Sequence, residues 1–285
     1  LPANDIGEAA LSELLGHKVR CDYIVRGGNR LGIYFLETGA SMRPSKVIYD
    51  RANSAMAEAR PEDFDFDRIF AGADWFHWSG ITPALSPQAA LLTEVACKEA
   101  KKRNITVSVD LNYRKKLWSA QMAQVTMRKM MRFVDVCIGN EEDIELTLGI
   151  KPKNVNVEAA IIDQEAYKAL FREVKDTFAC KIVASTLRES FSASKNGWSA
   201  IMYDGENFFR SRHYLIEPIV DRVGAGDAFS AGLIHGLLKH DKQQALEFAT
   251  AAGAIKHTIF GDFNLATEKE VDSLAEGNES GRVVR

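Results

Sequence analysis

The sequence predicts an α/β fold in which a mostly parallel sheet is flanked by helices and a small β-sheet forms a lid. Three observations lead to this expectation. From about residue 64 onward, short apolar strands alternate with amphipathic helices, as in parallel sheets covered on both faces. Residues 21–51 instead show side-chain alternation with tight glycine turns. A glycine-rich turn over 221–226 then opens a long apolar helix.

Composition limits the classes of protein and partner. The 285 residues are 46% hydrophobic and 26% charged, which suffices for one α/β domain or for a core with a smaller appendage. A net charge of −3, with no local basic patch, predicts no nucleic-acid partner. No apolar run is long enough to cross a bilayer, so we expect no membrane association. Four widely spaced cysteines indicate buried thiols and a cytoplasmic protein.

The predicted lid occupies residues 21–51, and the predicted core occupies 1–20 and 52–285. The lid strands are expected at 22–26, 31–37 and 46–50. A sheet of this size is not stable alone, and exposed apolar edges are usually covered. The sequence therefore predicts a homo-oligomer, a dimer or larger, that meets through the lid.

The core elements follow from local signals. Ser86 and Pro87 predict the N-cap and first turn of a helix that continues to residue 102. The other expected elements are a helix at 8–15, strands at 75–78, 105–109, 134–138, 181–185, 199–203 and 208–214, and helices near 121–131, from 227 and from 242. Polar clusters follow several strand ends, where open α/β sheets bind ligands.

The segment from Asp221 to Gly232 carries the strongest chemical signal. Gly224 and Gly226 lack Cβ atoms, so backbone N–H groups can converge on one anion at a helix N-terminus. Asp227 falls in the first turn of that helix. Further along the same helix, Gly232 and Gly236 would let the backbone of another element pack closely. Amides that hold negative charge beside one carboxylate suit phosphoryl transfer to a hydroxyl. The alternative is a glycine turn merely capped by an aspartate.

The stretch Asp221-Arg-Val-Gly-Ala-Gly-Asp-Ala-Phe229 resembles the C-terminal signature of the PfkB, or ribokinase-like, carbohydrate kinases. Gly139-Asn-Glu-Glu-Asp143 and the small sheet before the α/β body support this resemblance. Segments 27–36, 47–51 and 110–114 are most similar to 2-keto-3-deoxygluconate kinases. The resemblance covers essentially the whole chain. It implies a ribokinase-like fold and ATP-dependent phosphorylation of 2-keto-3-deoxygluconate to its 6-phosphate.

The resemblance also implies a site. Asp227 corresponds to the family's catalytic base, and the amides of Gly224, Ala225 and Gly226 correspond to its anion hole. The implied sugar-binding residues are Tyr34, Tyr49, Arg51, Ile81 and Arg114. The implied nucleotide-binding residues are Asn112, Arg114, Ser185, Thr186, Arg188, Gly224, Gly226 and Ala251. A guanidinium or a phenol suits an acid sugar, although the two tyrosines could serve lid packing and Arg51 could be a solvated charge.

The family uses an Asn-x-x-Glu motif to organise the water shell of magnesium. This chain has Asn140 and, at the glutamate position, the shorter Asp143, which could still reach the metal through water. Glu142 competes for that role, and Asn140 could also be a helix N-cap. The resemblance implies ATP and Mg²⁺ as cofactors and leaves a monovalent cation open.

Two other functions remain open. One is a neutral-sugar kinase of the fructokinase or ribokinase type, and the other is a non-catalytic sugar-binding protein of the same fold. Arg51 and Arg114 favour the acid sugar, because a neutral sugar gives no reason for a guanidinium near its far end. The family's first strand and its Gly-Gly-x-x-x-Asn substrate loop are expected before Leu1.

Overall fold

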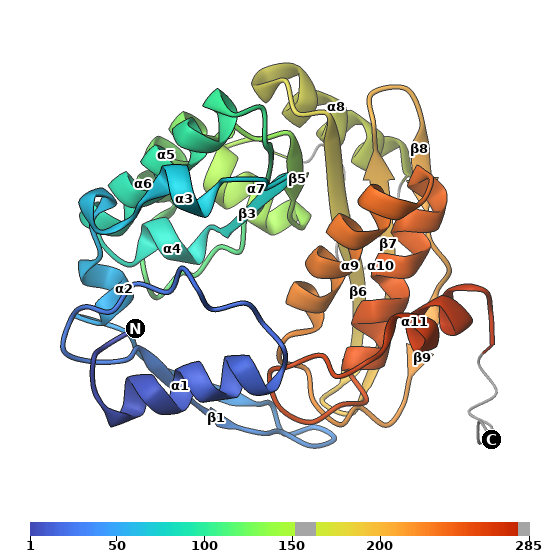
Figure 1. Ribbon diagram of the computed structural model, residues 1–285. Coiled ribbons are helices and arrows are strands. Elements are labelled where there is room, and N and C mark those ends of the chain that lie inside the picture. Colours follow the sequence, from blue (N-terminus) through green and yellow to red (C-terminus); the bar gives the residue numbers. More distant parts are fainter. Residues whose placement is uncertain (152–163, 279–285) are drawn as a thin grey trace. The chain divides into compact units, whose positions relative to one another are not determined.

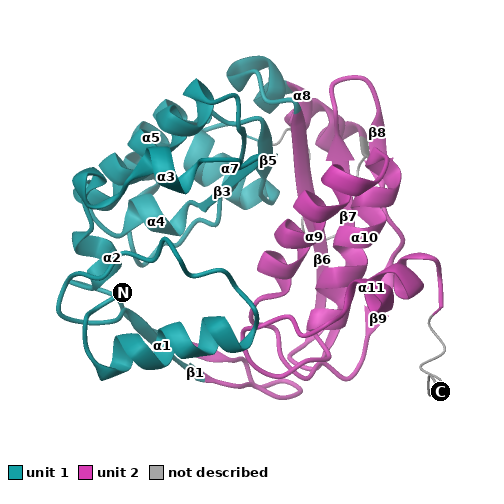
Figure 2. Cartoon of the chain, viewed as in Figure 1, with its two compact units in different colours: residues 1–36, 47–151, 173–181 teal, residues 37–46, 152–172, 182–285 magenta. Residues whose placement is uncertain are grey.

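The computed structural model describes residues 1–151 and 164–278 (Figure 1). The chain divides into two compact units (Figure 2). Unit 1 comprises residues 1–36, 47–151 and 173–181, and unit 2 comprises residues 37–46, 152–172 and 182–285. Residues 152–163 and 279–285 of the predicted core lie outside the described part.

Unit 1 contains three parallel strands. They are β3 (Trp75–Ser79), β4 (Thr106–Asp110) and β5 (Val136–Ile138), and β4 lies between the other two. The register pairs Ser79 with Asp110, and Asp110 with Ile138. The three carboxyl ends therefore meet at one edge of the sheet, as the sequence predicts. The polar residues that follow these strands start from that edge.

The helices of unit 1 start at local capping signals. Helix α5 has the predicted bounds, Pro87–Lys102, and the Ala89 N–H donates to the Ser86 hydroxyl at 3.0 Å. Helix α6 (Ala120–Met131) follows Ser119, and α7 (Glu141–Leu148) follows Asn140, in the same way. The other helical segments are α1 (Asp5–Gly16), α2 (Ala55–Glu58), a 3₁₀ turn at Pro61–Asp63, α3 (Phe66–Ile69) and α4 (Ile81–Ala84).

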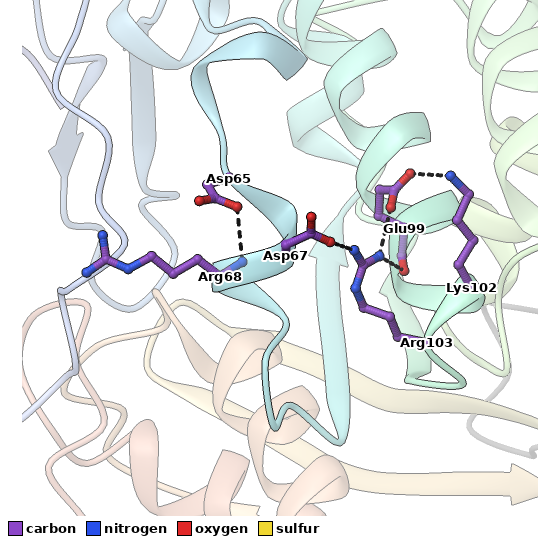
Figure 3. Close-up of polar contacts among 6 residues, drawn as sticks. All are labelled: Asp65, Asp67, Arg68, Glu99, Lys102 and Arg103. Atoms are coloured by element: carbon purple, nitrogen blue, oxygen red, sulfur yellow. Dashed lines mark hydrogen bonds and ion pairs between the residues drawn. The ribbon is translucent and has the colours of Figure 1, made fainter.

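Ion pairs connect the short helix α3 to the end of α5 (Figure 3). Arg103 donates to Asp67 and, at 2.7 Å, to Glu99, which also accepts from Lys102 at 2.6 Å. The Arg68 N–H donates to Asp65, the N-cap of α3, at 3.1 Å. Pairs at an exposed surface contribute little stability individually. This cluster anchors a helix that is too short to be stable by itself.

The lid contains two strands, β1 (Ile33–Glu37) and β2 (Lys46–Asp50), so the strand predicted at 22–26 is wrong. Backbone groups in and beside that segment instead pair with the first residue of the chain and within one turn. The Leu1 ammonium donates to the Val25 carbonyl at 2.8 Å, and the Gly27 N–H donates back to Leu1 at 2.9 Å. The Ile24 N–H closes a turn on Cys21 at 3.1 Å. These contacts occupy groups that a third strand would need.

Unit 2 contains an antiparallel group of strands around β7 (Lys195–Tyr203). Strand β6 (Ile182–Ser192) is longer than predicted and forms a hairpin with β7. The single strand predicted at 208–214 is wrong, because it is two strands, β8 (Phe208–Arg210) and β9 (Tyr214–Ile216), both paired with β7. Ser211 interrupts the run: its hydroxyl accepts the Ala200 N–H at 2.8 Å and donates to the Arg212 carbonyl at 2.9 Å.

Two helices of unit 2 pack backbone against backbone. Helix α9 (Ala225–Lys239) and helix α10 (Lys242–Lys256) both start where predicted, within a few residues. A Cβ on Gly232 would lie 2.9 Å from the Ala249 Cα, and one on Gly236 would lie 2.6 Å from the Ala245 Cα. The close packing predicted from these glycines is confirmed. The other helices are α11 (Glu268–Ala275) in unit 2 and α8 (Gln164–Phe178), whose residues are divided between the two units.

The predicted burial of the cysteine thiols is confirmed for three of the four, and Cys21 is only half-buried. All four cysteines are free, and Cys97, Cys137 and Cys180 are buried. Within residues 1–151 and 164–278, none of the helices is both long and apolar enough to cross a membrane.

Candidate active site

The turn before α9 is built around Gly224. This glycine is the N-cap of α9 and has φ 79° and ψ 0°, a left-handed conformation that glycine adopts without strain. A Cβ at this position would also lie 2.5 Å from the Asp262 carbonyl oxygen. The N–H groups of the first helical turn, from Ala225 to Asp227, have no partner within the helix. Together with the helix dipole they form an anion-binding end.

The outer side of this turn is open. Asp227 is exposed, and a Cβ added to Gly226 would meet no described atom within 4 Å. Asp227 lies in the first turn of α9, as predicted. The carboxylate and the first-turn amides therefore occupy one helix end, where a phosphate and a hydroxyl can approach them.

The inner side of the turn is held by a carboxylate and a carbonyl. Asp221 is buried and accepts the N–H groups of Val223 and Gly261, both at 3.1 Å. The N–H groups of Val220 and Asp221 donate to the His257 carbonyl at 2.8 and 3.2 Å. The segment after α10 thus fixes the conformation of the turn from behind.

The residues predicted for the nucleotide in unit 2 lie on β6 and α10. Ser185 is fully buried, and its hydroxyl donates to the Thr186 carbonyl at 3.1 Å. Thr186 is half-buried, while Arg188 is exposed with its guanidinium carbon 5.7 Å from the centre of the Trp198 ring. Ala251 is fully buried in α10. Thr186 and Arg188 are the members of this set that present side-chain atoms to solvent.

The residues predicted for the sugar lie in unit 1, and three of them form an aromatic and cationic cluster. The ring centres of Tyr34 and Tyr49 are 6.3 Å apart, and the Arg51 guanidinium carbon lies 4.4 Å from the Tyr49 ring. The Lys116 ammonium lies 5.7 Å from the same ring and donates to the Val47 carbonyl at 3.1 Å. Two positive charges therefore flank Tyr49, which suits a carboxylate.

The other predicted residues of unit 1 gather at the strand ends. The Ser79 hydroxyl accepts the Ile81 N–H at 3.3 Å and the Asn112 side-chain amide at 3.2 Å. Asn112 has φ 42°, a left-handed conformation that a non-glycine residue adopts rarely. Arg114 donates to the Tyr113 carbonyl at 2.9 Å and is half-buried. The structure brings Ile81 and Asn112 together through Ser79.

The two residues predicted for magnesium both make structural hydrogen bonds. Asn140 caps α7 by accepting the Asp143 N–H at 2.7 Å, and Asp143 accepts the Tyr113 N–H at 3.0 Å. Burial raises the pKa of Asp143 to about 6, and the positive charge of Arg114 opposes this shift. No group of three or more His, Cys, Asp or Glu residues in the described chain could hold a metal ion. These residues fit a magnesium ion held mainly by phosphate and water, and not a protein cage.

Two lysines near the predicted residues escaped the sequence reasoning. The only sequence signal for Lys116, which lies beside Tyr49, is the run of basic residues at 114–116. Lys256, at the end of α10, is fully buried close to Gly224. A lysine next to a histidine in a helix gives no sequence signal of burial, because that burial depends on segments distant in the chain.

Known proteins resemble this chain over most of its length. A 2-dehydro-3-deoxygluconokinase from Thermotoga maritima, solved by crystallography, is 50% identical with a TM-score of 0.92, over 97% of this chain and 83% of that one. A 2-dehydro-3-deoxygalactonokinase from Haloferax volcanii is 31% identical over 99% of this chain and 81% of its own length. A 2-dehydro-3-deoxygluconokinase from Thermoproteus tenax is 28% identical over 95% and 76%.

The pfkB family carbohydrate kinase model matches residues 1–267. This match agrees with the signature at Gly224 to Asp227, with the ribokinase-like α/β fold and with these relatives. The chain belongs to the pfkB family of carbohydrate kinases.

Proposed function

We propose that the protein transfers the γ-phosphoryl group of ATP to the terminal hydroxyl of 2-keto-3-deoxygluconate. The observation that carries this proposal is the N-terminus of α9, where Gly224 has the left-handed conformation and Asp227 is exposed in the first turn. The enzyme class follows from membership of a carbohydrate-kinase family, and ATP is the phosphoryl donor that we propose. The acid sugar is supported by Arg51 and Lys116 around Tyr49, and by the names of the relatives.

In this proposal each group of unit 2 has one task. The Asp227 carboxylate accepts the proton of the sugar hydroxyl while that oxygen forms a bond to the γ-phosphorus and the bond to ADP breaks. The amides of Gly224, Ala225 and Gly226 donate to the oxygens on which negative charge develops. Thr186 and Arg188 contribute to holding the nucleotide, and the buried Ser185 and Ala251 are the other nucleotide residues that we assign to unit 2 besides the turn.

In unit 1, Tyr34, Tyr49, Arg51 and Arg114 bind and orient the acid sugar, with the Ile81 backbone nearby. Asn112 and Arg114 complete the predicted contacts to the nucleotide. Asn140 and Asp143 would hold Mg²⁺ through water, and the bound ion would neutralise charge on the phosphates of ATP. Their hydrogen bonds to the backbone keep both side chains in place.

The substrate is tested by a coupled assay of ADP release. We expect turnover with 2-keto-3-deoxygluconate and much slower turnover with fructose and ribose, which lack a carboxylate. The C4 epimer, 2-keto-3-deoxygalactonate, belongs in the same assay because of the name of the Haloferax relative. Equal rates with fructose would overturn the acid-sugar assignment and favour the neutral-sugar alternative.

The role of Asp227 is tested by Asp227→Asn. The amide keeps the size of the side chain but cannot accept the hydroxyl proton, so kcat should fall by about 10²- to 10⁴-fold. The KM values for ATP and sugar should change little, because neither ligand needs the carboxylate for binding. An unchanged kcat would remove Asp227 from this role. A wild-type protein that binds the sugar without turnover would instead favour the non-catalytic alternative.

We also propose that the chain forms a homo-oligomer through the lid. On one face of the two lid strands, Ile33, Phe35 and Ile48 are all exposed. Apolar side chains grouped on an unpaired sheet face indicate an interaction surface.

A further inference from the structure

The least expected group near the anion-binding turn is the ammonium of Lys256. Its residue is completely buried at the last position of α10, although lysines are almost never fully buried unless paired. The Lys256 ammonium donates to the Ile259 carbonyl at 3.0 Å. No step of the proposed reaction uses this charge, and a buried charge without compensation costs several kcal/mol.

The position of Lys256 connects it to the turn. The Lys256 Cε lies 3.3 Å from the place that a Cβ on Gly224 would occupy, on the inner side of the turn. Asp221, which accepts the N–H groups of Val223 and Gly261, and Asp262, whose carbonyl lies against Gly224, both interact electrostatically with the ammonium. Burial lowers the pKa of Lys256, and these two carboxylates oppose the shift.

The surroundings are those of a bound cation. The ammonium donates to one carbonyl oxygen, the negative charges of Asp221 and Asp262 act on it electrostatically, and the same Asp221 carboxylate fixes the backbone of the turn. A cation at this place neutralises Asp221 and leaves the adjacent amides to face an incoming anion. Without it, the negative charge of Asp221 would be offset by its hydrogen bonds from the N–H groups of Val223 and Gly261 alone, and it would repel an anion that approaches the adjacent turn.

We propose that Lys256 is a positioning residue whose ammonium serves as a built-in monovalent cation, holding the Asp221–Asp227 turn in shape and making phosphoryl transfer independent of added K⁺ or Na⁺. This inference rests on the proposed phosphoryl site at Gly224 to Gly226. It assigns to a side chain of this chain the charge that a bound monovalent ion would otherwise supply.

The first test uses the unmodified protein. Its rate of ADP release is measured in KCl, in NaCl and in tetramethylammonium chloride of equal ionic strength, with Mg²⁺ and both substrates constant. Tetramethylammonium serves as the reference because it is too large for a site that accepts K⁺ or Na⁺. Equal rates are expected in the three salts, because the Lys256 ammonium already fills that site. A rate that falls several-fold when K⁺ and Na⁺ are removed would overturn the inference.

The second test removes the charge. Lys256→Met keeps most of the side-chain volume, and we expect kcat to fall about 10- to 100-fold with a smaller change in KM for the sugar. Lys256→Ala leaves space, so its rate should be low in tetramethylammonium and recover several-fold with NH₄⁺ or K⁺. Lys269→Met, at an exposed lysine of α11, is the matched control and should behave as the wild type.

The outcomes separate the two proposals. A folded Lys256→Met with wild-type kcat, or a folded and slow Lys256→Ala that no small cation restores, would overturn the role of Lys256. If both variants fail to fold, the salt comparison on the wild type decides. A wild type without turnover would refute the proposed function instead. In that case, calorimetry would measure the affinity of each variant for ATP and so test whether Lys256 supports the phosphate site.

Discussion

At the scale of single residues, the helix-opening glycine turn could be predicted, and the buried side chains that support it could not. Gly224, Gly226 and Asp227 are consecutive or nearly so, and their place at the N-terminus of α9 follows from local backbone geometry. Lys256 lies about thirty residues away in sequence and meets the turn only because α10 packs antiparallel along α9, which brings the last residue of α10 beside the first turn of α9. Sequence patterns report periodicity and local turns, but they do not report which polar side chain becomes buried.

His257 gives this buried support a measurable pH dependence. It is fully buried, and its Nδ1 lies 2.7 Å from the Gly253 carbonyl, so the neutral ring donates there. Burial, followed by the nearby charges of Arg188, Arg222 and Lys256, lowers the pKa of His257 to about 4, against the hydrogen bond to Gly253. The unfolded chain therefore binds a proton between pH 6.5 and pH 4 that the folded chain does not bind.

This difference predicts acid destabilisation. The contribution of His257 to stability is present above pH 6.5 and is lost as the pH falls through 4. His257→Asn keeps a donor near the Nδ1 position and does not titrate. Between pH 7 and pH 4.5, the free energy of unfolding should fall by about 2 kcal/mol more in the wild type than in this variant. Urea titrations at the two pH values measure it, with the exposed His240→Asn as control. Parallel losses in His257→Asn and wild type would contradict the assignment.

At the scale of elements, boundaries with a side-chain signal were predictable. Helix α5 has its predicted bounds because Ser86 and Pro87 define its first turn. The prediction of a lid strand at 22–26 failed because the first residues of the chain pair with that segment. The predicted strand at 208–214 is divided because the Ser211 hydroxyl competes for backbone groups. Both errors arise from hydrogen bonds that no periodicity encodes.

The packing of α9 on α10 provides a prediction at this scale. In Gly236→Ala the new Cβ would lie 2.6 Å from the Ala245 Cα, so the helices must separate. Overpacking costs about 1 to 3 kcal/mol, which exceeds the gain of about 1 kcal/mol in helix propensity. The free energy of unfolding should therefore decrease by up to about 2 kcal/mol. Gly16→Ala, where a Cβ meets no described atom within 4 Å, is the control and should cause no loss.

At the scale of the whole molecule, the predicted functions fall into the two units. The residues assigned to the sugar, Tyr34, Tyr49, Arg51, Ile81 and Arg114, belong to unit 1. The amides of residues 224–226 and the carboxylate of Asp227 belong to unit 2. The predicted reaction type rests on one motif of unit 2, whereas the proposed choice of sugar rests on side chains from several segments of unit 1. The assignment of residues 21–51 to a separate lid domain remains a prediction.

The outer face of that lid gives the last prediction. Phe35 is 59% exposed and Ile48 is 67% exposed, on strands β1 and β2 that form a sheet of only two strands. Such an apolar face is stabilised when a second copy of the chain covers it, because apolar area is then removed from water. Light scattering at micromolar concentration should give at least a dimeric mass for the wild type and a monomeric mass for the double variant Phe35→Asp with Ile48→Asp. Leu91→Asp, at a side chain 52% exposed on α5, places the same charge away from the lid and should leave the mass unchanged. A monomeric wild type, or a double variant that keeps the wild-type mass, would show that the lid is not the contact.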